Sequence, residues 1–201
     1  MFALVESGSI TKMLNGRRGI TIGDIQHPRA IYTLWTEAER NALGIYEVVF
    51  DDTNKKDEKW YINTNQSYAF GSGKVTATYG TATAKAHADA NFTAQDETDG
   101  LGTEGELKSR GLKYKLIQDV KLEAANELAK TDWYVVRKTE ESTAIPSSIT
   151  THRRAVRSKQ ASMETAITNA SDTPALETLY TYTRQEDGSV TRPLGELPKL
   201  D

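Results

Sequence analysis

The stretch that decides the fold is residues 112–128, which read LKYKLIQDVKLEAANEL. Apolar side chains recur in it at every fourth position, namely at Leu112, Leu116, Val120, Ala124 and Leu128. Because residues four apart lie on one face of an α-helix, this spacing predicts an amphipathic helix, which we place between Glu106 and about Thr131. A stripe at every fourth position drifts around the helix, so this helix is expected to cross its packing partner at an angle.

A second helix downstream is predicted to be that partner. Pro146 stands where a first helical turn favours proline, and the residues of one helical face follow it: Ile149, His152, Val156, Met163 and Ile167. Between the two stripes, the first helix is expected to end at Asp132-Trp133, and Tyr134 to Val136 to be extended. The sequence therefore predicts a helical hairpin over residues 106–170. Trp133 is expected to be buried at its junction, and Asp132 to accept backbone N–H groups as a cap.

The first 80 residues predict a small β-rich domain. Short runs of alternating apolar residues, separated by turns such as Ser7-Gly8, are typical of strands joined in hairpins. One short helix is predicted within this domain, because Thr36 and Glu39 have the spacing of a capping box. Gly44 follows at the position of a left-handed helix end.

Two further segments flank the predicted helical hairpin. Residues 81–105 are rich in Ala, Thr, Asp and Gly and carry acidic charge, which predicts a linker that is ordered only if a partner or the following helix holds it. Residues 171–201 begin with a short helical turn, and Asp187-Gly188 then predicts a β-hairpin. An extended arm from Pro193 to Asp201 ends the chain. The whole pattern predicts an α+β fold.

The composition argues against several classes of protein. The 201 residues carry a net charge of -3 and are 26% charged, so there is no overall attraction to nucleic acid or to an anionic membrane. Cysteine is absent, which excludes disulfides and thiolate sites. No apolar run approaches the roughly 18 residues that a membrane span requires. We therefore expect a soluble protein that binds neither nucleic acid nor a membrane.

The sequence gives little support to a catalytic or cofactor site. Residues 100–105, GLGTEG, have the glycine spacing of a dinucleotide-binding fingerprint. However, an acidic loop precedes them instead of a strand, and Glu104 would repel phosphate. Metal ligands usually come in pairs on one element, whereas the three histidines are dispersed. His152 is better interpreted as a histidine at the edge of the core, and the loop around Asp52 lacks the glycine and closing glutamate of a calcium loop. We expect no catalytic residue, cofactor, metal or small-molecule ligand.

Two groups of residues are candidates for binding another protein. Arg154 and Arg157 belong to a basic segment of the second helix, for which a solvated face is the first interpretation and an acidic partner the alternative. An isolated β-hairpin is marginal in water, and the C-terminal arm has little of its own to pack against. The tail is therefore expected to be mobile in the monomer and to contact another subunit or protein through Tyr180, Tyr182, Leu194, Leu197 and Leu200.

Two segments carry a resemblance to known families. Residues 4–10 (LVESGSI) and 35–48 (WTEAERNALGIYEV), with Ile20 to Asp24 and Pro28 between them, resemble the N-terminal module of many phage tail fibre and tail-associated proteins, especially from marine phages. Residues 123–157 contain TDWYVVRK, Ile145-Pro146 and RRAVR. They are similar to the helical module of phage tail assembly chaperones, in which an Asp-Trp pair precedes a second helix with a Tyr-Arg-x-x-hydrophobic-Arg run. His152 stands where that family usually has Tyr.

The resemblance implies a non-enzymatic bacteriophage tail protein that is made in the host cytoplasm and binds other tail proteins of the fibre or baseplate, or a second copy of itself. The favoured hypothesis is a structural component of the virion tail, baseplate or fibre attachment. The alternative is a transient tail fibre assembly chaperone, and an unrelated small enzyme is the third hypothesis. The C-terminal hairpin and arm extend past the usual end of the chaperone module. They favour the virion component, because such a segment locks a docked protein onto its neighbour.

Overall fold

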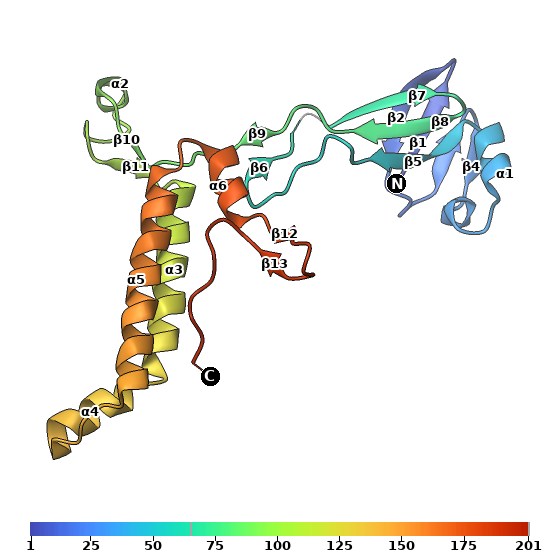
Figure 1. Ribbon diagram of the computed structural model, residues 1–201. Coiled ribbons are helices and arrows are strands. Elements are labelled where there is room, and N and C mark those ends of the chain that lie inside the picture. Colours follow the sequence, from blue (N-terminus) through green and yellow to red (C-terminus); the bar gives the residue numbers. More distant parts are fainter. Residues whose placement is uncertain (65, 201) are drawn as a thin grey trace. The chain divides into compact units, whose positions relative to one another are not determined.

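Helices and strands both contribute to the fold, in a computed structural model that describes residues 1–64 and 66–200. The described residues form six α-helices and a curled five-stranded β-sheet with several two-stranded pairs, which confirms the broad α+β class (Figure 1). The chain divides into two units, residues 1–83 and 84–201. Asp201, the last residue of the predicted arm, lies outside the described residues.

The first unit is built around the five-stranded sheet, whose strand order is β2-β1-β5-β8-β7. Its strands are β1 (Phe2–Glu6), β2 (Ser9–Leu14), β5 (Ile45–Asp51), β7 (Ser67–Gly71) and β8 (Lys74–Thr78). Neighbouring strands run antiparallel, except that β5 and β8 are parallel and place Val48 opposite Val75. The two edge strands, β2 and β7, approach each other because the sheet curls.

Both faces of this sheet bury apolar side chains. Successive residues of a strand point to opposite faces, so Ala3 and Leu4 of β1 belong to two different apolar clusters. The unit also contains β3 (Ile20–Ile22), β4 (Ile25–His27), the 3-10 helix η1 (Arg29–Tyr32), α1 (Glu37–Ala42) and β6 (Tyr61–Ile62). Strand β6 pairs with β9 (Thr83–Ala84). The cluster of Leu4 extends into β3 and η1 through Ile20 and Ile31.

The local signals of the first unit have the predicted geometry. Ser7 and Gly8 have φ angles of 51° and 78°, the left-handed conformation that a two-residue hairpin turn requires. The hydroxyl of Thr36 accepts from the Glu39 backbone N–H at 3.3 Å, and the Glu39 carboxylate accepts from the Thr36 N–H at 2.8 Å. Gly44 has φ +77°, and a Cβ there would lie 2.5 Å from the Val5 carbonyl oxygen. The predicted capping box and left-handed helix end are confirmed.

The second unit contains the predicted helical hairpin. Helices α3 (Leu112–Ala129) and α5 (Ser147–Asn169) lie side by side in opposite directions (Figure 1). They bury most of the residues that the two stripes predicted, whereas Leu112 and Leu128 are only partly buried. The buried residues are Leu116, Val120, Ala124, Ile149, His152, Val156, Met163 and Ile167. Pro146 is the residue just before α5 rather than its first residue. Helix α6 (Thr173–Tyr180) follows α5 and buries Leu176.

Residues 81–111 are more ordered than a linker. Strand β10 (Ala90–Asn91) pairs with β11 (Leu107–Ser109), and the short helix α2 (Ala94–Thr98) between them has a capping box. The backbone N–H groups of Leu112 and Lys113 donate to carbonyl groups of this segment. The start of helix α3 therefore holds the segment in place, as expected for the case in which the following helix orders it. The predicted start of the first helix at Glu106 is wrong, because β11 occupies that stretch and α3 begins at Leu112.

The C-terminal segment forms the predicted β-hairpin from β12 (Thr183–Arg184) and β13 (Val190–Thr191). The arm that follows is not free. Leu194 and Leu197 are 2% and 7% exposed, the Lys159 ammonium of α5 donates to the Leu194 carbonyl at 2.8 Å, and the Leu200 N–H donates to Glu127 of α3 at 3.2 Å. These contacts correct the expectation that the arm has little in its own chain to pack against.

Candidate protein-binding site

Helix α4 (Asp132–Glu141) presents apolar side chains to solvent at the far end of the α3–α5 hairpin, where it projects beyond both helices (Figure 1). None of its 10 residues is buried. Trp133 is 51% exposed, Val135 40% and Val136 52%. Trp133 and Val136, three residues apart, lie on one side of the helix, and exposed apolar side chains that lie together mark an interaction surface more often than chance. Two expectations are therefore wrong: Trp133 is not buried at the junction, and residues 134–136 are helical rather than extended.

The aromatic side chains of α4 are braced against each other. The rings of Trp133 and Tyr134 have centroids 3.9 Å apart, and the Arg137 guanidinium lies 4.6 Å from the Trp133 ring centroid and 5.4 Å from that of Tyr134. Stacking of a cation on aromatic faces restricts the rotamers of all three side chains. A tryptophan that is held in place before it binds loses little entropy on binding, which is a property of binding hot spots.

The direction of α4 is fixed by Arg153 of α5, which is buried. Its Nη1 donates to the Leu128 carbonyl at 2.8 Å and to the Thr131 hydroxyl at 2.7 Å, and it lies 2.8 Å from the Asp132 carboxylate. Asp132 therefore pairs with Arg153 and does not cap the helix as expected. Sequence reasoning missed this residue, although a signal was present: Arg153 lies four residues after Ile149, on the apolar face of α5.

A hollow of about 710 Å³ lies at the base of α4. Its walls come from α4, the start of α5 and the end of the C-terminal arm, and include Tyr134, Ile149, His152, Pro198 and Leu200. Among the residues predicted to bind a partner, Leu200 therefore lies beside α4 and is 38% exposed. The hollow and the exposed apolar side chains of α4 together make the candidate site.

The other predicted partner-binding residues of the tail lie elsewhere. Leu194 and Leu197 are buried against the helical hairpin. Tyr180 ends α6 rather than lying in the β-hairpin, and burial raises the pKa of its phenol to about 12. Tyr182 is 54% exposed and donates to Glu196 at 2.8 Å. The structure therefore does not bring these residues together with Leu200 into one surface.

Glu127 of α3 holds the end of the arm in place and is itself buried. Its carboxylate accepts from Lys130 Nζ at 2.6 Å and from the Leu200 N–H at 3.2 Å, and His152 Nε2 lies 3.4 Å from it. The hydrogen bond from Lys130, with a further contribution from the Leu200 N–H, lowers the pKa of Glu127 from its ordinary value. His152 occupies the apolar face at the edge of the core, as predicted.

Acidification is expected to release the arm. Because the pKa of Glu127 is lower in the folded chain, its stabilising contribution is complete above the ordinary carboxyl pKa and is lost as the pH falls through the folded-state pKa. Hydrogen-exchange protection factors of residues 194–200 are expected to fall once the pH drops below the ordinary pKa of a glutamate carboxyl group. The variant Glu127→Gln should have low protection already at neutral pH and show no such step. Equal pH profiles for the two proteins would refute this role of Glu127.

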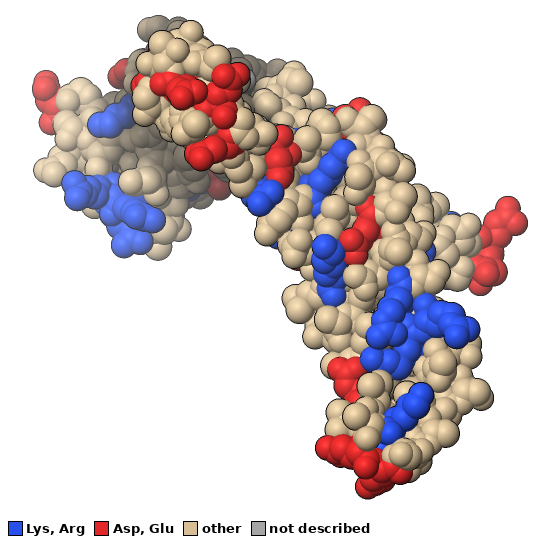
Figure 2. Space-filling model, turned by 90° about the vertical axis from the view of Figure 1, so that its left-hand side faces the viewer, with Lys and Arg blue, Asp and Glu red and all other residues tan. Residues whose placement is uncertain are grey.

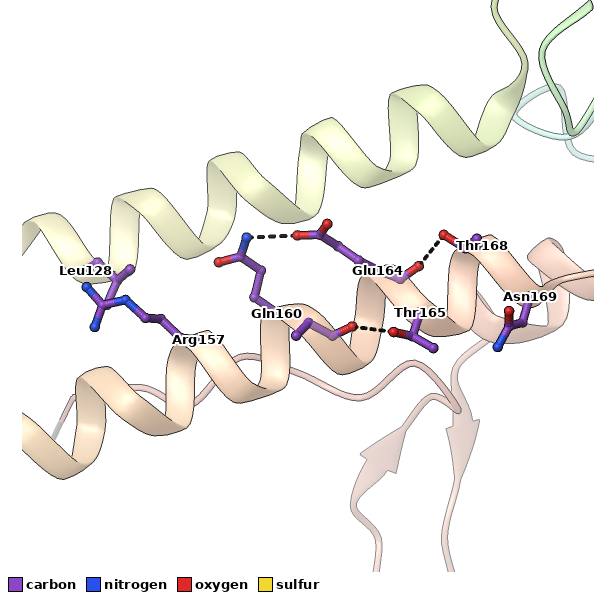
Figure 3. Close-up of a pocket in the computed structure, with 8 residues that line it drawn as sticks. Leu128, Arg157, Gln160, Glu164, Thr165, Thr168 and Asn169 are labelled. Atoms are coloured by element: carbon purple, nitrogen blue, oxygen red, sulfur yellow. Dashed lines mark hydrogen bonds between the residues drawn. The ribbon is translucent and has the colours of Figure 1, made fainter.

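The predicted basic pair lies along α5. Arg154 and Arg157 are both exposed, and Arg157 lines a second, open hollow of about 660 Å³ between α3 and α5 (Figure 3). Glu164 also lines this hollow, where it accepts from Gln160 at 2.8 Å and lies 3.8 Å from Lys121. The hollow has Leu128 on its α3 side, so it offers both an apolar contact and a cation.

The remaining motifs have structural roles. The glycines of residues 100–105 link α2 to strand β11, so the helix N-terminus that a pyrophosphate requires does not follow them. Within residues 1–64 and 66–200, no three His, Asp or Glu side chains gather as a metal site would require. In the same described ranges, no helix has the length and apolar character to cross a membrane. Comparison with protein-family models, curated proteins and solved structures yields no match to this chain.

Proposed function

We propose that this chain is a non-enzymatic bacteriophage tail protein that works by binding another tail protein, as a structural component of the tail, baseplate or fibre attachment. The observation that carries the proposal is the exposed, braced apolar surface of α4. Its Trp133 belongs to the Asp-Trp motif on which the resemblance to phage tail proteins rests. In this proposal a β-rich domain with one short helix precedes the helical hairpin, and the hairpin presents the binding surface.

One observation favours a second candidate function, that of a transient tail fibre assembly chaperone. The expectation of permanent docking rested on an arm that lies on a neighbouring protein. Leu194 and Leu197 of that arm are instead buried on the chain's own hairpin, so the arm in this conformation is not available as an anchor. Mass spectrometry of purified virions separates the two candidates. A virion component is found there in a fixed copy number, whereas a chaperone is absent from virions and required for fibre assembly. Normal assembly of phage that lacks the chain would contradict both.

The double variant Trp133→Ala with Val136→Ala is expected to lose partner binding. A central exposed aromatic anchor typically contributes 2 kcal/mol or more to binding, so its loss should weaken the interaction at least about thirtyfold. The fold should be retained, because solvent-exposed substitutions usually change the free energy of unfolding by less than about 0.5 kcal/mol. The measurement is the amount of chain per virion, or the yield of assembled fibres if the chain is a chaperone.

The matched control for this experiment is Leu122→Ala, which removes a side chain that is 62% exposed on the neighbouring helix α3. It also removes an exposed apolar side chain but leaves α4 intact. We expect it to behave as the wild type in either assay. If the α4 double variant is also incorporated and active at wild-type level, α4 is not the binding surface.

A further inference from the structure

The second unit carries an exposed acidic surface at one end. We call residues 97–106, which comprise the end of α2 and the segment that follows it, the acidic loop. Its carboxylates at Glu97, Asp99, Glu104 and Glu106 are all exposed. Among the described residues none of these four has an ion-pair partner, whereas the nearby Asp96 is bound by Lys108. Leu101 stands in the middle of the loop with 61% of its surface exposed. The loop thus combines concentrated negative charge with one large apolar side chain that its own chain leaves uncovered.

A basic surface lies near the middle of helix α5 in the same unit. We call Arg154 and Arg157, with the hollow beside Arg157, the basic face. Both arginines are exposed, and neither has a carboxylate partner within residues 1–64 and 66–200. The hollow is lined by Leu128 and Ala161 together with polar side chains that include Gln160 and Glu164, and Leu128 lies near Arg157 (Figure 3). The basic face therefore offers the two features that the acidic loop lacks, namely cations and an open recess with an apolar wall.

These two surfaces face the same side of the unit but cannot meet within one molecule. Figure 2 shows Asp and Glu gathered over the α2 end and Lys and Arg spread along the face presented by the helical hairpin, with a further group of Asp and Glu at the α4 tip. Arg157 lies 12 residues before Asn169, the last residue of α5, which corresponds to roughly 18 Å along the helix. Complementary charge for either surface must therefore come from a second molecule.

We propose that two copies of this chain associate side by side in opposite directions through this face. The acidic loop of each copy then lies on the basic face of the other, and Leu101 enters the hollow beside Arg157. A two-fold arrangement forms both contacts at once and closes, so it produces a dimer rather than a chain of subunits. This dimer goes beyond the proposed function, because it uses α5 and the acidic loop and leaves the apolar surface of α4 open to another protein.

Salt dependence is the first expected property of this dimer. Single exposed ion pairs contribute little, but here four carboxylates meet two arginines twice. Screening shortens the range of these charges from about 10 Å at 0.1 M salt to about 3 Å at 1 M. Sedimentation velocity is expected to give twice the 22.3 kDa of one chain at low salt and one chain's mass at about 1 M NaCl. A chain that is monomeric at every concentration and ionic strength overturns the proposal.

Charge reversal gives the decisive experiment. The acid-reversed variant, Glu97→Lys with Asp99→Lys, and the base-reversed variant, Arg154→Glu with Arg157→Glu, should each raise the dimer dissociation constant at least about tenfold, because the first cancels the charge of the acidic loop and the second places like charges opposite each other. In a mixture of the two variants, the introduced lysines face the introduced glutamates at one contact, and the native charges meet at the other. A one-to-one mixture is therefore expected to dimerise more tightly than either variant alone, and a mixture that stays monomeric contradicts the proposed pairing.

The matched control changes the same charge in the other unit. Arg17→Glu with Arg18→Glu shifts the net charge as the base-reversed variant does, and both residues are exposed. It is expected to dimerise as the wild type, and an equal loss of dimer would show that only net charge matters and refute the specific interface. Circular dichroism of each variant verifies that it is folded. Because α4 is unchanged in all of them, their behaviour is independent of the virion test of the proposed function.

Discussion

Replacing Leu116 by alanine is expected to lower the free energy of unfolding of the second unit by about 2–4 kcal/mol. Leu116 is 4% exposed and lies on the face of α3 that packs against α5. Its truncation removes buried methyl groups and leaves a cavity that two long helices cannot easily close. Urea unfolding followed by the helical circular dichroism signal measures the change, since α3 and α5 dominate the helical content of the chain.

Leu122→Ala is the control for this prediction, because it makes the same substitution on the exposed side of the same helix. Its side chain is 62% exposed, so the expected change is within about 0.5 kcal/mol. The comparison removes any effect of leucine or alanine on helix propensity. Equal losses for both variants would mean that the predicted apolar stripe is not what holds the hairpin together.

Arg153→Ala is expected to cost about 2–3 kcal/mol and to loosen α4. The substitution leaves the Leu128 carbonyl, the Thr131 hydroxyl and the Asp132 carboxylate without their charged donor. Thr131 is fully buried, so water cannot replace the guanidinium there without entering the core. The free energy of unfolding tests the first effect, and hydrogen-exchange protection of residues 132–141 tests the second.

Arg154 provides the matched control, since it is the next residue of the same helix and is exposed. Arg154→Ala should change the free energy of unfolding by less than about 0.5 kcal/mol and leave the protection of α4 unchanged. If the two alanine variants have the same stability and the same exchange behaviour, Arg153 is only one more cation of a solvated segment.

The features predicted correctly from the sequence are those whose cause is local. The Thr36–Glu39 capping box and the left-handed Gly44 depend on residues a few positions apart. The two apolar stripes likewise predict which faces of α3 and α5 pack against each other, because helical periodicity follows from the sequence alone. Glu127 was missed, although it lies seven residues after Val120 on that same inward face and so could have been identified.

The surface features could not be predicted, because they depend on which other part of the chain covers them. The sequence of an apolar arm is the same whether the arm packs on its own helical hairpin or on a neighbouring molecule. The burial of Leu194 and Leu197 therefore has no local sequence signal. Trp133 poses the reverse problem. A tryptophan at a helix junction is usually buried, but here α4 continues as a helix away from the hairpin and carries the indole into solvent.

The curled sheet of the first unit has a consequence for the behaviour of the protein at high concentration. The edges of an open sheet expose unpaired N–H and C=O groups that can recruit a strand from another molecule and begin aggregation. Here the two edge strands, β2 and β7, are brought toward each other by the curl. Each edge is thereby less open to a strand from another molecule, so we expect the first unit to resist aggregation by strand addition at high concentration.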